Sequence, residues 1–125
     1  MNATLRAHNA YRQDAQAVRT HRSVEYDAIA RITHALKTAA QRGKEDFPEL
    51  AAAIHENRRL WTVLATDTAD AGNALPEALR ARIVYLAEFT HQHSSRILSE
   101  GADAAPLIEV NTAILKGLRD QGPNQ

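Results

Sequence analysis

The sequence predicts an all-α fold, a single-domain helical bundle of four to five helices with one long central helix. Only five glycines and four prolines interrupt the 125 residues, and alanine, leucine, arginine and glutamate, all good helix formers, are abundant. Apolar residues recur at three- and four-residue steps, the period of an amphipathic helix. The length suits one domain, residues 1–125, large enough to bury a continuous core.

The first expected helix, within residues 1–22, has the thinnest apolar stripe. Such a helix depends on docking against another element, which makes this segment a candidate for mobility. Ser23 is a suitable N-cap for a second helix, expected from Val24 to Arg42. Gly43 is placed to end that helix.

A turn is expected at residues 45–48, after which Pro48 opens a third helix that runs to about Ala69. The last helix begins at Pro106 and reads PLIEVNTAILKGLR. Residues 121–125, which contain glycine and proline, are expected to be a frayed tail.

The central helix is expected from Leu75 to Leu98, with Pro76 in its first turn and Gly101 as its C-terminal stop. One face holds a stripe of apolar and neutral residues, namely Leu79, Ile83, Leu86, Thr90, His93 and Ile97. Val84, Tyr85 and Phe89 add apolar surface beside it. Because a helix this apolar is normally covered on more than one side, the sequence places it at the centre of the bundle.

Charge is unevenly distributed along a chain with no net charge. Residues 1–44 hold eight basic and three acidic residues, a net charge of +5, and the remainder holds seven and twelve, a net charge of −5. The basic third can contact nucleic acid or an acidic protein surface, or the two parts can complement each other within the fold. The absence of cysteine excludes disulfides and fits a reducing cytoplasm, and no stretch resembles a signal peptide or a membrane span.

No pattern in the sequence indicates catalysis, a metal site or a cofactor. The six histidines, at positions 8, 21, 34, 55, 91 and 93, include no pair at metal-binding helical spacing, since His91 and His93 point to nearly opposite sides of a helix. Glycine-rich phosphate loops and nucleophile elbows are absent as well. The sequence therefore predicts a protein that is not an enzyme and needs no cofactor.

Two asparagines stand on otherwise apolar faces. Asn57 lies four residues before Trp61, the only tryptophan, and Asn111 lies among Leu107 and Ile114. A buried amide must be hydrogen-bonded, so each asparagine either holds part of the fold together or fixes the register of a partner helix. Trp61 is expected in the core with its indole N–H bonded.

Five motifs follow one another along nearly the whole chain. They read NAYRQ, SVEYDAIARITHAL, NRRLWTVLATDTAD, NALPEALRARIVYLAEFTHQHS and PLIEVNTAILKGL. In combination, these motifs resemble the FlaF family of flagellar biosynthesis regulators from alphaproteobacteria. The resemblance implies a cytoplasmic protein that promotes flagellin synthesis and secretion and acts opposite the translational regulator FlbT. It further implies a type III export chaperone that covers an amphipathic helical segment of flagellin.

Flagellin is thus the expected partner, with FlbT or the flagellar export apparatus as further candidates and with no membrane insertion. A groove for a flagellin helix is expected beside the core stripes. Its candidate lining residues are Leu60, Val63, Tyr85, Phe89, Ile108 and Leu115. Polar residues expected to set the register or form the rim are Asn57, Arg58, Arg59, Arg82 and Asn111. Each apolar candidate can equally pack in the core, and the N-terminal helix can occupy or flank the groove when no partner is bound.

The alternative function is post-transcriptional, with the protein acting on translation of flagellin mRNA directly or through FlbT. Its support is the basic first third of the chain. Overall neutrality argues against nucleic-acid binding, which usually uses a clustered basic face. Added salt separates the two readings, because it weakens phosphate contacts steeply and apolar contacts little.

Overall fold

The computed structural model describes residues 25–70 and 72–120, and this part of the chain is helical with no strand. The first helix covers residues 25–42 and leads into a short 3₁₀ helix, η1 (Gly43–Asp46). Three longer helices follow, α2 (Phe47–Ala69), α3 (Glu77–Glu100) and α4 (Ala105–Asp120). The predicted all-α bundle is therefore confirmed. The predictions of an N-terminal helix within residues 1–22 and of a frayed tail at residues 121–125 lie outside the described residues.

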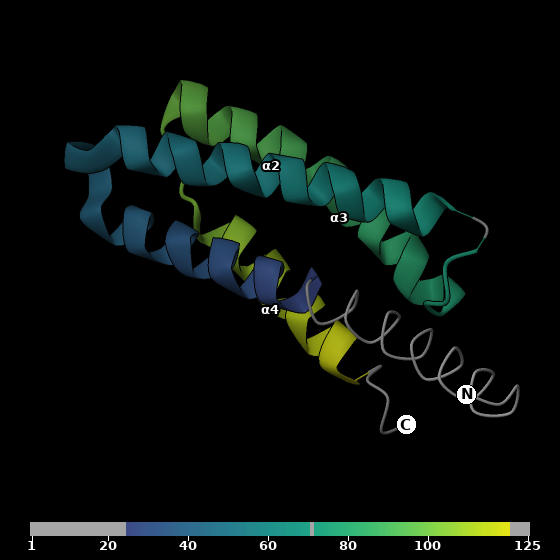
Figure 1. The fold of residues 1–125 in the computed structure, drawn as a ribbon. Helices are drawn as coiled ribbons and strands as arrows, with labels where there is room; N and C mark the ends of the chain where they lie inside the picture. The colour runs from purple at the N-terminus through teal and green to yellow at the C-terminus, as the bar shows by residue number, and fades with distance from the viewer. Residues whose placement is uncertain (1–24, 71, 121–125) are drawn as a thin grey trace, which may run out of the picture.

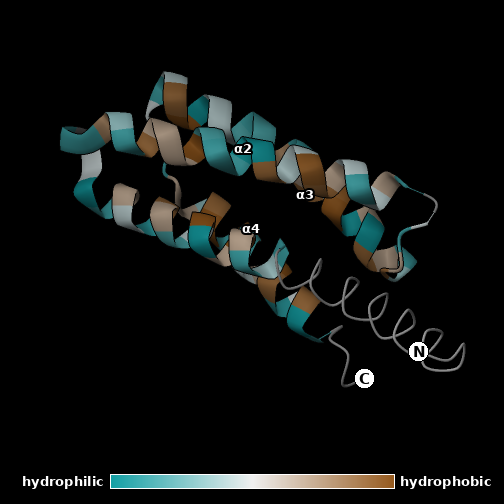
Figure 2. Ribbon diagram, in the orientation of Figure 1, coloured by the Kyte–Doolittle hydropathy of each residue, from teal (hydrophilic) through white to brown (hydrophobic). Residues whose placement is uncertain are grey.

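The helices are arranged as an up-and-down bundle (Figure 1). α2 and α3 lie side by side and antiparallel, and the first helix and α4 lie beneath them. Brown and teal bands alternate along each helix in Figure 2, as expected where apolar residues recur on one side and polar residues on the other.

Two glycines end helices, as the sequence predicts. Gly43 follows the first helix with φ at 68°, and Gly101 follows α3 with φ at 71°. This left-handed conformation costs glycine nothing because it has no Cβ. At Gly101 the backbone N–H donates to the carbonyl of Ile97 at 3.1 Å, which satisfies one of the open carbonyls at the end of α3.

The turn predicted at residues 45–48 is instead the end of η1, which continues directly into α2. Arg42 explains this compact connection, since its Nη1 donates to Asp46 Oδ2 at 3.1 Å and to Glu49 Oε2 at 2.9 Å. The hydrogen bond to Asp46 first, and then the charge of Glu49, raise the pKa of Arg42 above its ordinary value. Pro48 occupies the first turn of α2, where its missing N–H is not needed.

α3 begins at Glu77, two residues later than predicted. Asn73 holds the preceding loop in a non-helical path, because its Oδ1 accepts from Leu75 N at 2.9 Å and its Nδ2 donates to the Asp67 carbonyl at 3.1 Å. Pro76 stays extended, with ψ at 144°. The side-chain bonds of Asn73 thus replace a further helical turn.

The structure does not show α3 as a central helix. Val84 and Tyr85 were expected beneath neighbouring helices, yet they are 48% and 71% exposed. The buried side of α3 is the narrower stripe that includes Ile83, Ala87 and Ile97. Within the part of the chain that the structure describes, neighbouring helices therefore cover α3 on one side only.

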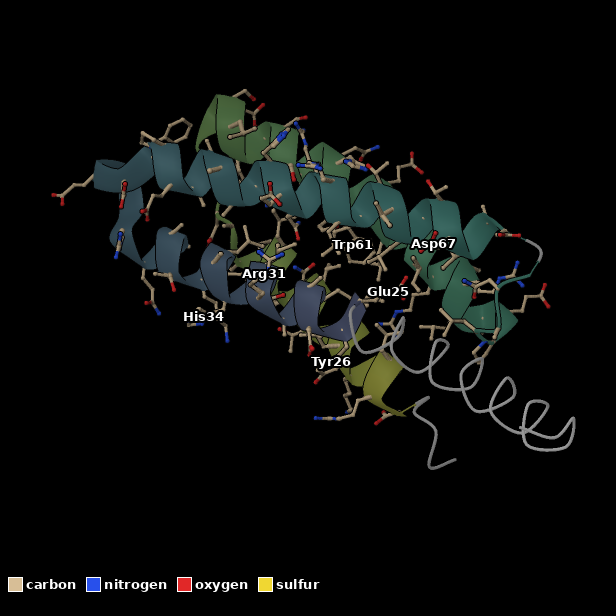
Figure 3. The ribbon with its side chains drawn as sticks, viewed as in Figure 1. Glu25, Tyr26, Arg31, His34, Trp61 and Asp67 are labelled. Carbon is tan, nitrogen blue, oxygen red and sulfur yellow. The ribbon has the colours of Figure 1, made fainter. Side chains whose placement is uncertain are left out.

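The core consists of two apolar clusters, one toward each end of the bundle. The η1-end cluster contains Leu36, Ala39, Ala53, Ile54, Ile97, Ala104 and Leu107. The Trp61 cluster contains Ile29, Trp61, Leu64, Ile83, Ala87 and Ile114. Figure 3 shows Trp61 pointing from α2 into the space between α2 and the first helix.

A layer of buried polar residues lies between the two clusters. This polar layer consists of Thr33, Asn57, Thr90, Ser94 and Asn111. Along every helix its members lie between a residue of one cluster and a residue of the other; on α2, for example, Asn57 lies between Ile54 and Trp61. Thr33 is 6% exposed and the other four members are fully buried.

Candidate functional site

Hydrogen bonds within the polar layer centre on Asn111. Its Oδ1 accepts from Trp61 Nε1 at 2.8 Å, and its Nδ2 donates to Asn57 Oδ1 at 2.8 Å and to Thr33 Oγ1 at 3.1 Å. Thr33 Oγ1 in turn donates to the Ile29 carbonyl at 2.6 Å. The predicted core position of Trp61, with its N–H bonded, is confirmed.

This arrangement places Asn57 and Asn111 away from any partner-binding surface. Both are fully buried, and their amides bond to each other rather than to an open groove. Of the two readings open from sequence, the structure therefore supports the one in which the asparagines hold this fold together.

Three of the apolar groove candidates lie partly inside the bundle. Leu60 and Leu115 pack against the Trp61 cluster, and Ile108 packs against the η1-end cluster. Their apolar surface is thus largely used within the chain, because helix packing covers residues beside a core stripe as well as those in it. We leave them out of the candidate site on this ground.

The other candidates on α3 come together on its outer surface. Arg82, Tyr85, Phe89 and His93 follow one another at three- and four-residue steps, so they share one face of the helix. We name these four residues the α3 outer stripe. Arg82 and Tyr85 are exposed, and Phe89 and His93 are partly buried. Exposed aromatic and arginine side chains are enriched at protein–protein interfaces.

His93 supports the C-terminal half of the stripe through two contacts. Its ring stacks on Phe89, with centroids 5.6 Å apart and planes at 9°. Its Nε2 lies 2.7 Å from the carbonyl oxygen of Asp103, in the turn before α4. Because a carbonyl oxygen can only accept, Nε2 carries the proton and donates. The bond fixes the ring, and the ring in turn limits the rotation of Phe89.

The remaining candidates lie on α2, apart from the stripe. Val63 is 54% exposed and lies on the outer side of α2. Arg58 is hydrogen-bonded to α3, since its Nη2 donates to the His91 carbonyl at 3.0 Å and to Ser95 Oγ. Arg59 is exposed, with Nη1 3.6 Å from Glu56 Oε1. The structure therefore brings together Arg82, Tyr85 and Phe89 out of the predicted set.

Sequence reasoning missed the role of His93 and most of the polar layer. His93 was assigned to the core stripe, and only its bond to the next turn shows that it supports the outer face. The positions of Thr33, Thr90 and Ser94 could have predicted the polar layer from sequence. Each occupies a core-facing position at the level of an asparagine on a neighbouring helix. Short polar residues on core stripes are easily passed over as neutral.

The described residues include no group of three or more histidine, aspartate or glutamate side chains that could hold a metal ion. Among the described helices, none combines the length and the apolar character that crossing a bilayer requires.

Comparison with known proteins agrees with the motifs along the chain. The profile of the family described as flagellar protein FlaF matches residues 7–118, which include every described helix except the last two residues of α4. No curated protein and no solved structure gives a significant match. Because the profile covers most of the sequence, the chain belongs to the FlaF family of flagellar proteins.

Proposed function

We propose that this protein binds unassembled flagellin through the α3 outer stripe and promotes its synthesis and export, acting as a type III export chaperone in the cytoplasm. Membership of a flagellar family supports the choice of partner. The observation that carries the proposal is Tyr85, a tyrosine 71% exposed on a helix whose opposite side is buried. A large aromatic side chain left in water at this site suits an interface anchor.

The chemistry of the stripe suits an amphipathic helix. Tyr85 and Phe89 offer apolar surface one helical turn apart, and Arg82 lies one turn before Tyr85, where it can meet a carboxylate on the partner. A flagellin segment that is disordered before assembly orders itself at a free-energy cost when it binds. That cost keeps binding releasable, as export requires.

Calorimetric titration of the protein with monomeric flagellin tests the proposal. We expect binding near micromolar or tighter, and loss of binding when flagellin is truncated at the end that carries the captured segment. Tyr85→Glu and Phe89→Glu should each weaken binding at least tenfold. Val63→Glu is the matched control, because it places the same charge on an exposed valine of α2, away from the stripe.

Each outcome separates the partner from the site. If wild-type protein does not bind flagellin, the chaperone function is wrong. If only Val63→Glu abolishes binding, flagellin is the partner but the stripe is not the site. A steep loss of affinity for flagellin mRNA with added salt, together with no affinity for flagellin, would favour the post-transcriptional function instead.

A further inference from the structure

α3 contributes two hydroxyl groups to the polar layer, and neither has a hydrogen-bond partner in the part of the chain that the structure describes. Thr90 Oγ1 and Ser94 Oγ are fully buried and form no hydrogen bond with the described residues. Buried polar groups are nearly always paired, and an unpaired one costs the full loss of its hydration. Packing α3 against the bundle therefore costs free energy at these two residues, because each buries an unpaired hydroxyl.

Other serine and threonine hydroxyls in the bundle donate to the backbone of their own helix. Six serine and threonine side chains donate to the carbonyl four residues earlier, namely Thr33, Thr62, Thr66, Ser95, Ser99 and Thr112. Thr90 and Ser94 do not form this bond. Their oxygens therefore lie in the interior without the hydrogen bond to the carbonyl four residues earlier that the other hydroxyls form.

A third unpartnered group lies at the same level of the bundle. Asn57 Nδ2 on α2 is buried and has no hydrogen-bond partner among the described residues. The next residue, Arg58, bonds to the His91 carbonyl and to Ser95 Oγ on α3. These bonds place residues 57 and 58 of α2 opposite residues 91–95 of α3, so the unpartnered groups gather where the two helices meet.

The other three helices are joined by buried hydrogen bonds that leave α3 out. Asn111 of α4 bonds to Asn57 and Trp61 of α2 and to Thr33 of the first helix. α3 is tied to α2 by hydrogen bonds that are exposed or only partly buried, through Arg58, through the contact of Thr62 with His91, and through Arg80 Nε, which donates to the Thr68 carbonyl. Water can replace such bonds at a lower cost, whereas breaking the fully buried network leaves its groups unpaired.

The fully buried positions in the middle of α3 hold no large apolar side chain. The large fully buried apolar side chains of α3 are Ile83 and Ile97, one toward each end. The core positions between them hold Ala87, Thr90 and Ser94, which are small or polar, and the partly buried Leu86 packs against the Trp61 cluster. Apart from Leu86, separating the middle of α3 from the bundle therefore exposes mainly small or polar side chains.

We propose that α3 is the mobile helix of this bundle and that its middle separates from α2 while the first helix, α2 and α4 stay joined. Opening lets water reach Thr90 Oγ1, Ser94 Oγ and Asn57 Nδ2, which removes this free-energy cost of the closed state. The opening is a property of the protein alone and stands whether or not flagellin is the partner.

Amide hydrogen exchange of the wild-type protein tests the opening directly. Amides between Ala87 and Ile97 on α3 should be at least tenfold less protected than those in the middle of α2 and α4. Equal protection on the three helices would mean that α3 opens only with the whole bundle, which would overturn the proposal.

Two variants test the cause. Thr90→Val with Ser94→Ala removes both unpartnered hydroxyls, and exchange on α3 relative to α2 should slow at least tenfold. Ser99→Ala is the control, because Ser99 is exposed on α3 and its hydroxyl already bonds to the Ser95 carbonyl at 2.7 Å. An unchanged ratio in the double variant would show that the hydroxyls do not drive opening.

A covalent cross-link between the two helices gives an independent test that leaves the polar layer intact. Thr62 Oγ1 and His91 Nε2 lie 3.3 Å apart, and the chain has no cysteine, so Thr62→Cys with His91→Cys offers a single pair of thiols for a short bifunctional thiol reagent that spans the space of the lost imidazole. Cross-linking should raise protection on α3 to the level of α2, with the same protein before cross-linking as control. Faster or unchanged exchange on α3 after cross-linking would contradict the proposal.

Discussion

Replacing Asn111 with alanine tests whether the polar layer stabilises the bundle. The change removes three hydrogen bonds, from Trp61 Nε1 at 2.8 Å, to Asn57 Oδ1 at 2.8 Å and to Thr33 Oγ1 at 3.1 Å. Trp61 and Asn57 are fully buried in the folded state, so each loses its hydrogen-bond partner without gaining a bond to water. Thr33 still donates to the Ile29 carbonyl, so its loss is smaller.

The size of the effect follows from the groups left unpaired. A buried donor or acceptor without a partner costs about 1–3 kcal/mol, and here there are one of each, at Trp61 Nε1 and Asn57 Oδ1. Alanine returns roughly 0.5 kcal/mol through its higher helix propensity. We therefore expect Asn111→Ala to lower the free energy of unfolding by about 3 kcal/mol.

Urea unfolding followed by far-UV circular dichroism and by the fluorescence of Trp61, the only tryptophan, measures this change. Thr112→Ala is the control, since Thr112 is exposed on the neighbouring position of α4 and should cost no more than about 0.5 kcal/mol. A cycle with Trp61→Phe removes the indole donor, so the double variant should lose less than the sum of the single changes. A loss below about 1 kcal/mol for Asn111→Ala would refute the reasoning.

Two glycine substitutions have opposite expected signs. Gly117→Ala should raise the free energy of unfolding by about 0.5–1 kcal/mol, because alanine favours the helix and its Cβ would meet Leu79 Cδ1 at 3.6 Å, an ordinary contact. Destabilisation in urea unfolding would show that α3 and α4 approach each other more closely than this distance. Gly101→Ala should lower it by about 1–2 kcal/mol, because φ at 71° disfavours any side chain. Gly101→Asn should cost less than Gly101→Ala, and an equal loss for the two would contradict the left-handed stop.

Most of the fold could be predicted from local patterns. The glycine stops at Gly43 and Gly101, the end of α2 and the position of α4 depend on neighbours in sequence, so composition and spacing were sufficient. The turn expected at residues 45–48 was instead helical, because η1 continues into α2. The start of α3 was misplaced by two residues because Asn73 bonds to Asp67 across the loop, a contact that spacing does not reveal. The predicted central position of α3 is not shown by the structure, for a different reason. Apolar content indicates which residues can be buried, but not whether a neighbour covers Val84 and Tyr85.

The candidate site was only partly predictable. Arg82, Tyr85 and Phe89 share a face by helical spacing alone, so the sequence could place them together. Leu60, Ile108 and Leu115 lie beside core stripes, and which of the two sides of a stripe is covered depends on the packing of whole helices. The supporting role of His93 depends on a carbonyl ten residues away in the next turn. Such contacts require the tertiary structure.

The hydrogen bond from Asn111 to Thr33 has a consequence for the order of folding. It joins residues 78 apart in sequence, whereas the connections at η1 and Gly101 each join helices that follow one another directly. Closing the longer loop costs more chain entropy, so the two helical hairpins can form before the first helix meets α4. Disrupting this bond should then speed unfolding and leave the folding rate nearly unchanged, while a change at Gly43 or Gly101 should slow folding. The hydrogen bonds of the polar layer thus form after the transition state for folding, so they set how long the folded bundle lasts rather than how fast it assembles.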